Sequence, residues 1–101
     1  MRPVIWSIEA HRHNLETLRH IAEDNPAAAE RVVDAIEQAG NALGEFATGR
    51  PGRVTGMYEK SVSRLPYIIA YELREIAGQE SVVIVHVIHT ARDWPAEEWP
   101  H

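Results

Sequence analysis

The sequence has 101 residues, 45% of them hydrophobic and 25% charged, which favours one folded domain with a modest core over a disordered chain. It contains no cysteine, which excludes disulfides and thiolate metal sites and is compatible with a reducing cytosol. The formal net charge of −5 mildly favours a protein partner over nucleic acid, because an acidic chain lacks long-range attraction to phosphates. No signal-peptide pattern is present and no apolar run approaches the ~20 residues that span a bilayer, so we expect a cytoplasmic protein without membrane contact.

The first half of the chain predicts a short strand followed by two helices. Residues 2–7 contain good strand formers, and Ser7 is a suitable helix N-cap. Apolar residues then recur at helical spacing over 8–22. Asn25 is a second candidate cap, and the proline that follows it suits the first turn of a helix over 26–43. Two adjacent amphipathic helices with a tight turn form a helical hairpin.

The second half predicts three consecutive strands over 53–59, 64–74 and 81–89, separated by turns. The element order is therefore β-α-α-β-β-β. We expect an α+β fold in which the helical hairpin packs on one face of a small, mainly antiparallel sheet. Residues 1–101 form a single domain, with 90–101 as a C-terminal tail.

The turns predict how the last strands pair. With Ala77–Gly78 at the centre of the final hairpin, residues whose numbers sum to about 155 face each other. With Ser61–Val62 at the centre of the preceding hairpin, Glu59 lies near Arg64. This register gathers Glu59, Arg64 and His89 at one end and on one face of the sheet. A slip of one residue would reverse the faces.

Both faces of the predicted sheet are apolar. One carries Leu65, Tyr67, Ile69, Tyr71, Leu73, Val82, Ile84 and Ile88. The other carries Pro66, Ile68, Ala70, Val83, Val85 and Val87. Two helices can cover only one face of so small a sheet, and a strand that is apolar on both sides is normally buried on both sides. The remaining face therefore predicts a binding partner.

Several stretches resemble the RelE/ParE superfamily of toxins from bacterial toxin–antitoxin modules. They follow one another along nearly the whole chain: Ile5-Trp6-Ser7, residues 21–29 across the helical hairpin, residues 50–54 entering the sheet, residues 65–71, and residues 89–94 after the last strand. The resemblance implies the same β-α-α-β-β-β fold. It also implies a toxin neutralised by a cognate antitoxin, ParD-like or RelB-like, in a hetero-oligomer. The antitoxin would bind the uncovered face, with Arg53 contributing beside the six residues assigned to that face above.

The superfamily contains two mechanisms, and the resemblance leaves both open. RelE-like members cleave messenger RNA on the ribosome, which needs a base, an acid and cations around the phosphate. Arg64, His89 and Arg92, assisted by Glu59, are the catalytic candidates for that reading. ParE-like members poison DNA gyrase without cleaving RNA. Ile68 stands where RelE-like toxins often place an arginine, and Gly52 stands where some place a glutamate. These departures favour ParE-like inhibition of gyrase, and a toxin that only binds its antitoxin is a third possibility.

Other candidate residues have ordinary alternatives. Arg50, Arg53, Lys60 and Arg64 form a local basic segment that suits RNA, acidic antitoxin side chains or plain solvation. Arg92, Trp94 and Trp99 near the C-terminus are candidates for docking the target, against the alternative that the tryptophans pin the tail to the domain. His11, His13 and His20 are too irregularly spaced for a metal site. His86 is expected to be a packed core residue. We expect no metal and no cofactor.

Overall fold

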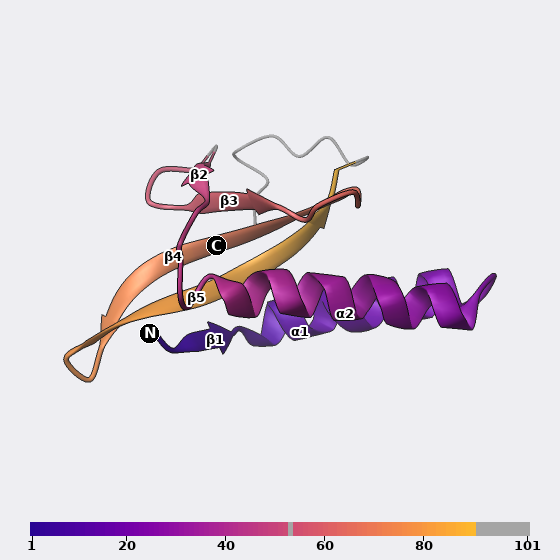
Figure 1. The fold of residues 1–101 in the computed structure, drawn as a ribbon, viewed down its shortest axis with the longest axis horizontal. Coiled ribbons are helices and arrows are strands. Elements are labelled where there is room, and N and C mark those ends of the chain that lie inside the picture. Colours follow the sequence, from indigo (N-terminus) through magenta and orange to yellow (C-terminus); the bar gives the residue numbers. More distant parts are fainter. Residues whose placement is uncertain (53, 91–101) are drawn as a thin grey trace.

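A computed structural model describes residues 1–52 and 54–90 of the chain. The described part contains two helices and five strands: β1 (Val4–Trp6), α1 (Ile8–Ala22), α2 (Pro26–Ala42), β2 (Arg50–Pro51), β3 (Tyr58–Ser61), β4 (Tyr67–Ile76) and β5 (Gln79–His89). The sheet order is β1-β5-β4-β3-β2. β1 lies parallel to β5, and the other pairs are antiparallel. Both helices cover the same face of the sheet (Figure 1). The predicted α+β architecture is confirmed.

The helical hairpin forms as the sequence predicts. The Ser7 side chain accepts the Ala10 N–H at the start of α1, and the Asn25 side chain accepts the Ala28 N–H at the start of α2. Gly40 on α2 allows close packing, because a Cβ at this position would lie 2.5 Å from the Trp6 ring and 2.8 Å from Ile84. The helix, β1 and β5 therefore meet without space for a larger residue.

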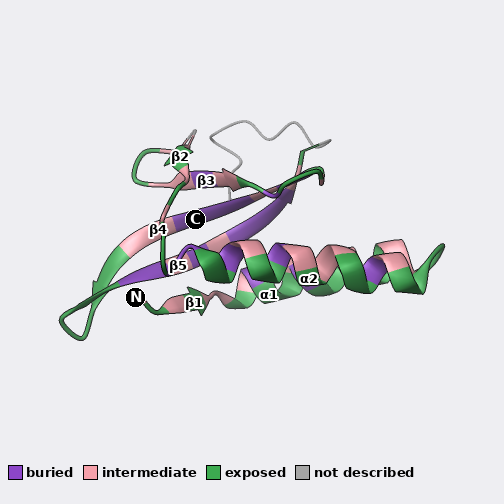
Figure 2. Ribbon diagram, in the orientation of Figure 1, coloured by how far each residue is buried: buried purple, intermediate pink, exposed green. Residues whose placement is uncertain are grey.

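The core lies between the helices and the sheet. Ile36 and Leu43 of the helical segment pack there against strand residues that are almost fully buried. Those strand residues are Tyr67, Ile69, Tyr71, Val82, Ile84 and Val87. A smaller cluster lies on the other face of the sheet, where Ala70 and Ile88 pack with Val54 and Met57. Ile69, Ala70 and Tyr71 are consecutive and fully buried, so both faces of β4 are covered in this part of the strand (Figure 2).

The final hairpin has the predicted turn and, for half its length, the predicted register. Ala77 and Gly78 have φ values of 53° and 78°, as a two-residue type I′ turn requires. Leu73 faces Val82, and this pairing continues as far as Tyr71 and Ile84. The register then shifts, because Ala70 faces His86 and Val85 has no partner.

This β-bulge overturns the predicted faces of the last two apolar residues of β5. The extra residue on β5 reverses the alternation beyond it. Val87 faces Ile69 and belongs to the helix-side core, whereas Ile88 faces Ile68 and lies in the cluster on the other side. The assignment of Val87 to the uncovered face is therefore wrong, and Ile88 takes that place.

The predicted β3–β4 pairing is also wrong. Glu59 faces Ala70, six residues further along the chain than Arg64. The connection is longer than a tight turn: Val62 donates its N–H to the Tyr67 carbonyl, and Leu65 donates to Val62. Val62 is 4% exposed, so this connection is anchored in the core rather than free to close as a two-residue hairpin. The predicted strand 53–59 likewise begins only at Tyr58, after a turn at Gly56 with φ of 86°.

No helix among the described residues is long and apolar enough to cross a membrane.

Candidate partner-binding face

The sheet face opposite the helices presents partly exposed apolar residues from three neighbouring strands. Ile68 on β4 pairs with Ile88, and Val83 on β5 pairs with both Glu72 and Ile5. Ile5 points away from the core, because its neighbours Val4 and Trp6 pack toward the helices, and it is 41% exposed. We call this surface the open face: Ile5, Ile68 and Val83 are the exposed or partly exposed residues on it, and Ile88, at 7% exposure, is buried at one end of it. It remains uncovered by the two helices (Figure 1).

One end of the open face is covered by the chain itself. Val54 and Met57, from the segment between β2 and β3, pack on Ala70 and Ile88. Ala70 is consequently 0% exposed, so its own side chain is not available to a partner. The sequence prediction missed Val54, Met57 and Ile5 because it considered only the last two strands. The alternation of β1 was a visible signal for Ile5.

The remaining residues predicted for this face lie at its margins. Pro66 is exposed in the connection between β3 and β4, and its carbonyl accepts the Thr90 N–H at 2.8 Å. Val85 is the bulged residue and is partly exposed. Arg53 lies outside the described residues, as do Arg92, Trp94 and Trp99.

The structure separates Glu59 from His89. Glu59 faces Ala70 and therefore lies on the open-face side of the sheet. His89 faces Tyr67, a helix-side core residue, and the two rings meet edge-on with centroids 5.1 Å apart. Tyr67 and Ala70 are three residues apart along one strand, which corresponds to about 10 Å. Glu59 and His89 therefore do not lie together on one face of the sheet, as the predicted register would place them.

Gly52 borders Glu59. A Cβ at position 52 would lie 2.9 Å from both the Cγ and the Oε2 atoms of Glu59, which is only 7% exposed. A glutamate at position 52, the residue that some RelE-like toxins are expected to carry there, would collide with Glu59. Glycine at position 52 therefore fits the packing around Glu59, where a larger residue would not.

Arg64 lies in the connection that joins β3 to β4. The Leu65 N–H donates to the Val62 carbonyl at 3.2 Å, which closes a four-residue turn with Arg64 in its third position. Arg64 has φ of 64°, the left-handed value that type II turns require there. Its side chain is exposed.

Two side chains cap the outer edge of β5 beyond the end of β1. Ser7 donates its hydroxyl to the Val85 carbonyl at 2.8 Å, and the Val87 N–H donates to Nδ1 of His13 at 3.1 Å. The His13 ring lies 5.4 Å from the ring of His86, which is 1% exposed as the sequence predicts for a core histidine. Burial lowers the pKa of His13 below its usual 6.5 and His86 lowers it further, while Glu16 and Glu9 act in the opposite direction. A neutral His13 is what the hydrogen bond from Val87 requires.

Tyr71 fixes the segment that leads into β2. Its ring is fully buried and stacks on Tyr58 with centroids 5.5 Å apart, and its hydroxyl accepts the Gly49 N–H at 2.9 Å. A Cβ at Gly49 would lie 2.4 Å from that hydroxyl, so only glycine fits. Burial raises the pKa of Tyr71 above 10.0, with the hydrogen bond from Gly49 opposing the rise.

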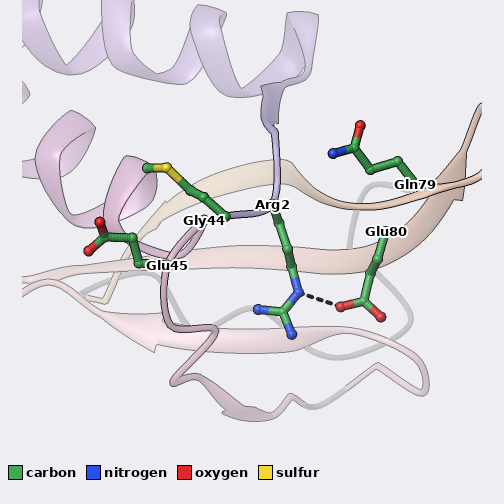
Figure 3. Close-up of a pocket in the computed structure, with 6 residues that line it drawn as sticks. Arg2, Gly44, Glu45, Gln79 and Glu80 are labelled. Atoms are coloured by element: carbon green, nitrogen blue, oxygen red, sulfur yellow. Dashed lines mark hydrogen bonds and ion pairs between the residues drawn. The ribbon is translucent and has the colours of Figure 1, made fainter.

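A hollow of about 370 Å³ lies where the N-terminus meets the final hairpin, lined by Met1, Arg2, Gly44, Glu45, Gln79 and Glu80. Figure 3 shows Arg2 reaching across it to pair with the carboxylate of Glu80. The Arg2 backbone N–H also donates to the Gly44 carbonyl at 2.8 Å. These contacts tie the N-terminus to the fold. Within residues 1–52 and 54–90, no group of three or more histidine or acidic side chains is placed to hold a metal ion.

Comparisons with known proteins agree with this geometry. The family model of the ParE toxin of the type II toxin–antitoxin system parDE matches residues 4–94. A curated relative from Sinorhizobium fredii, named "Putative toxin Y4kP", is 38% identical over 91 residues, covering 89% of this chain and 90% of the relative.

Two solved structures share the fold. A chromosomal ParDE system from P. aeruginosa matches with a TM-score of 0.77 at 19% identity, covering 88% of this chain and 96% of that one. The RelBE2 toxin–antitoxin complex from Mycobacterium tuberculosis matches with a TM-score of 0.61 at 19% identity, covering 87% and 96%. On the strength of the family model and the curated relative, this chain belongs to the ParE toxin family of type II toxin–antitoxin systems, within the ParE/RelE superfamily.

Proposed function

We propose that this toxin inhibits DNA gyrase and is held inactive by a cognate antitoxin that covers the open face. The antitoxin half of the proposal rests on the apolar residues that the two helices leave uncovered. Ile5 is 41% exposed, and Ile68 and Val83 are partly exposed beside it on adjacent strands. Partly exposed apolar residues on three neighbouring strands are the kind of surface that an amphipathic partner covers. Both similar solved structures are toxin–antitoxin systems, which supports the same kind of partner here.

The observation that carries the preference for gyrase is the separation of Glu59 from His89. A ribonuclease that used these residues would need both within reach of one phosphate. In this chain Glu59 lies on the open-face side, and His89 packs on Tyr67 at the helix side. The match to the ParE toxin family supports the same choice. Trapping gyrase in its cleaved-DNA state requires a docking surface on the toxin, but no acid or base of its own.

The test is to induce the toxin without its antitoxin in a bacterial host and to follow the DNA damage response and messenger RNA integrity in the same culture. Damage with intact message is the expected result. Rapid message cleavage without damage would replace gyrase with the ribosome as the target. Normal growth with neither effect would reduce the protein to an antitoxin-binding partner.

A matched variant sharpens this test. His89→Ala removes the one histidine among the predicted catalytic residues, and a gyrase inhibitor should retain its toxicity after this change. Loss of toxicity in His89→Ala, with antitoxin binding and melting temperature unchanged, would favour the ribonuclease alternative.

A further inference from the structure

Arg64 occupies a backbone position that its residue type does not favour. The third position of the Val62–Leu65 turn requires a positive φ, and Arg64 adopts 64°. Glycine or asparagine normally fills this position, because a Cβ in the left-handed region is strained. Both ends of the turn are held by packing: Val62 is buried, and Leu65 contacts the core. The fold therefore imposes the strained conformation on Arg64.

The side chain of Arg64 contributes nothing visible to the fold in return. The residue is exposed, and its side chain makes no ion pair or hydrogen bond with any residue in the described ranges. By contrast, Arg2, Arg12 and Arg74 each pair with a neighbouring glutamate. Strain that persists without a structural benefit is a recognised mark of a functional position.

The strand segments beside Arg64 lack acidic residues although the chain as a whole is acidic. Residues 60–71 and 81–90 contain no aspartate or glutamate, whereas the net charge of the chain is −5. The Thr90 N–H donates to the Pro66 carbonyl, so the end of β5 lies beside the turn that carries Arg64. Lys60 is at the other side of the same turn, near the end of β3. This end of the sheet suits an anionic partner.

We propose that Arg64 is a target-contacting residue, held exposed at this end of the sheet so that its guanidinium binds carboxylates on the surface of gyrase. The inference rests on the proposed function. Carboxylates are favoured over DNA phosphates, because DNA binding needs several cations that act together along the backbone, which this acidic chain does not supply, whereas one guanidinium can pair with one carboxylate. A guanidinium pairs with carboxylates in a bidentate manner that an ammonium cannot reproduce.

The experiment compares Arg64→Gly with Ala77→Gly. Ala77 is the other non-glycine residue with positive φ in the described chain, at 53°, and it lies in the tip of the final hairpin, at the other end of β4 from Arg64. Both substitutions relieve the same kind of backbone strain in the folded protein, which outweighs the greater freedom of glycine in the unfolded chain. Both should therefore raise the melting temperature by a few degrees. Only Arg64→Gly should weaken inhibition of purified gyrase, by about tenfold or more. Two further variants distinguish the guanidinium group from its charge. Arg64→Lys keeps the positive charge but lacks the guanidinium, and Arg64→Gln lacks both.

The expected result is weaker gyrase inhibition by Arg64→Gly and Arg64→Gln, with unchanged affinity for the antitoxin encoded beside the toxin gene, and full activity in Ala77→Gly. Full inhibition by Arg64→Gly would overturn the proposal. So would an equal loss of antitoxin affinity, which would place Arg64 in the antitoxin interface instead.

Binding to gyrase is also measured without DNA. If Arg64→Gly weakened binding only when DNA was present, the contact would be to phosphates and the carboxylate assignment would fail. If the wild-type toxin did not inhibit gyrase, the proposed function itself would be wrong. The assignment of the Arg64 contact to gyrase would then be wrong as well.

Discussion

The two faces of the sheet have the same kind of sequence but different structural roles. On the helix side, Ile69, Tyr71 and Ile84 are 0% exposed and belong to a core cluster that also contains residues of both helices. On the open face, Ile68 and Val83 are partly exposed to solvent, and both helices lie on the other side of the sheet (Figure 2). Apolar composition alone does not distinguish a core from a binding surface. What distinguishes them is whether the chain has another element available to cover the residue.

The sharpest way to test this contrast is to truncate one residue on each face. Ile84→Ala should lower the free energy of unfolding by about 3 kcal/mol, because it leaves a cavity in a packed core. Ile5→Ala, on the open face, should cost about 1 kcal/mol or less, because the side chain is 41% exposed already. Urea denaturation of the isolated toxin measures both. Equal losses would show that the open face stabilises the fold as strongly as the core does.

A charged residue on the open face should affect binding rather than folding. Val83→Lys places a cation opposite Glu72, which strand pairing tolerates, so the free energy of unfolding should change by about 1 kcal/mol or less. Antitoxin affinity, measured by calorimetry, should fall by about tenfold or more, since the lysine would have to lose its hydration when the antitoxin covers the open face. Ile8→Lys on α1, where the side chain is 85% exposed, is the matched control and should leave affinity unchanged. A similar loss in both variants would remove the open face from the antitoxin interface.

The buried hydroxyl of Tyr71 tests how the core holds the segment before β2. Tyr71→Phe keeps the ring but leaves the Gly49 N–H without its acceptor, which should cost about 1 kcal/mol. Hydrogen exchange at the Gly49 amide should become faster. Tyr58→Phe, in the ring stacked on Tyr71, is the control and should not alter exchange at Gly49. Unchanged exchange in Tyr71→Phe would show that this hydrogen bond does not fix the segment.

The smallest expected effect is a pH dependence of the free energy of unfolding that arises from His13 at the edge of β5. Burial lowers the pKa of His13 in the folded protein, so the unfolded chain takes up the proton first as the pH falls. The contribution of neutral His13 is therefore present above its unfolded pKa of about 6.5 and declines as the pH falls through the folded value. Stability measured at pH 7.5 and pH 5.5 should differ less in His13→Ala than in the wild type. His20→Ala, on the exposed side of the same helix, should keep the wild-type difference.

Local signals in the sequence were sufficient for the helices and for the tip of the last hairpin. Ser7 and Asn25 are caps whose side chains bond nearby backbone groups, and Ala77–Gly78 is a two-residue turn whose geometry sets the register of the strands beside it. In each case the interaction lies within a few residues. That is why the predicted helix bounds and the pairing of Leu73 with Val82 are confirmed.

The errors arose where distant contacts decide the backbone. The bulge at Val85 has no local sequence signature, yet it moves Val87 into the core and Ile88 out of it. The β3–β4 connection is longer than predicted because Val62 and Leu65 pack into the core, and this places Glu59 opposite Ala70. The sequence did predict an apolar face opposite the helices, because apolar patterning does not depend on one exact register. Of the residues assigned to that face, Ile68 and Val83 lie there partly exposed, whereas Val87 is in the core. The grouping of Glu59 with His89 depended on the register entirely.

Purified toxin, gyrase and supercoiled plasmid in one tube, with no ribosomes present, give the most direct test of the proposed mechanism. The expected result is accumulation of cleaved plasmid DNA in the presence of gyrase, suppressed when the antitoxin is added first. Unchanged supercoiling by gyrase at toxin concentrations that stop growth would contradict the mechanism and return the ribosome to consideration as the target.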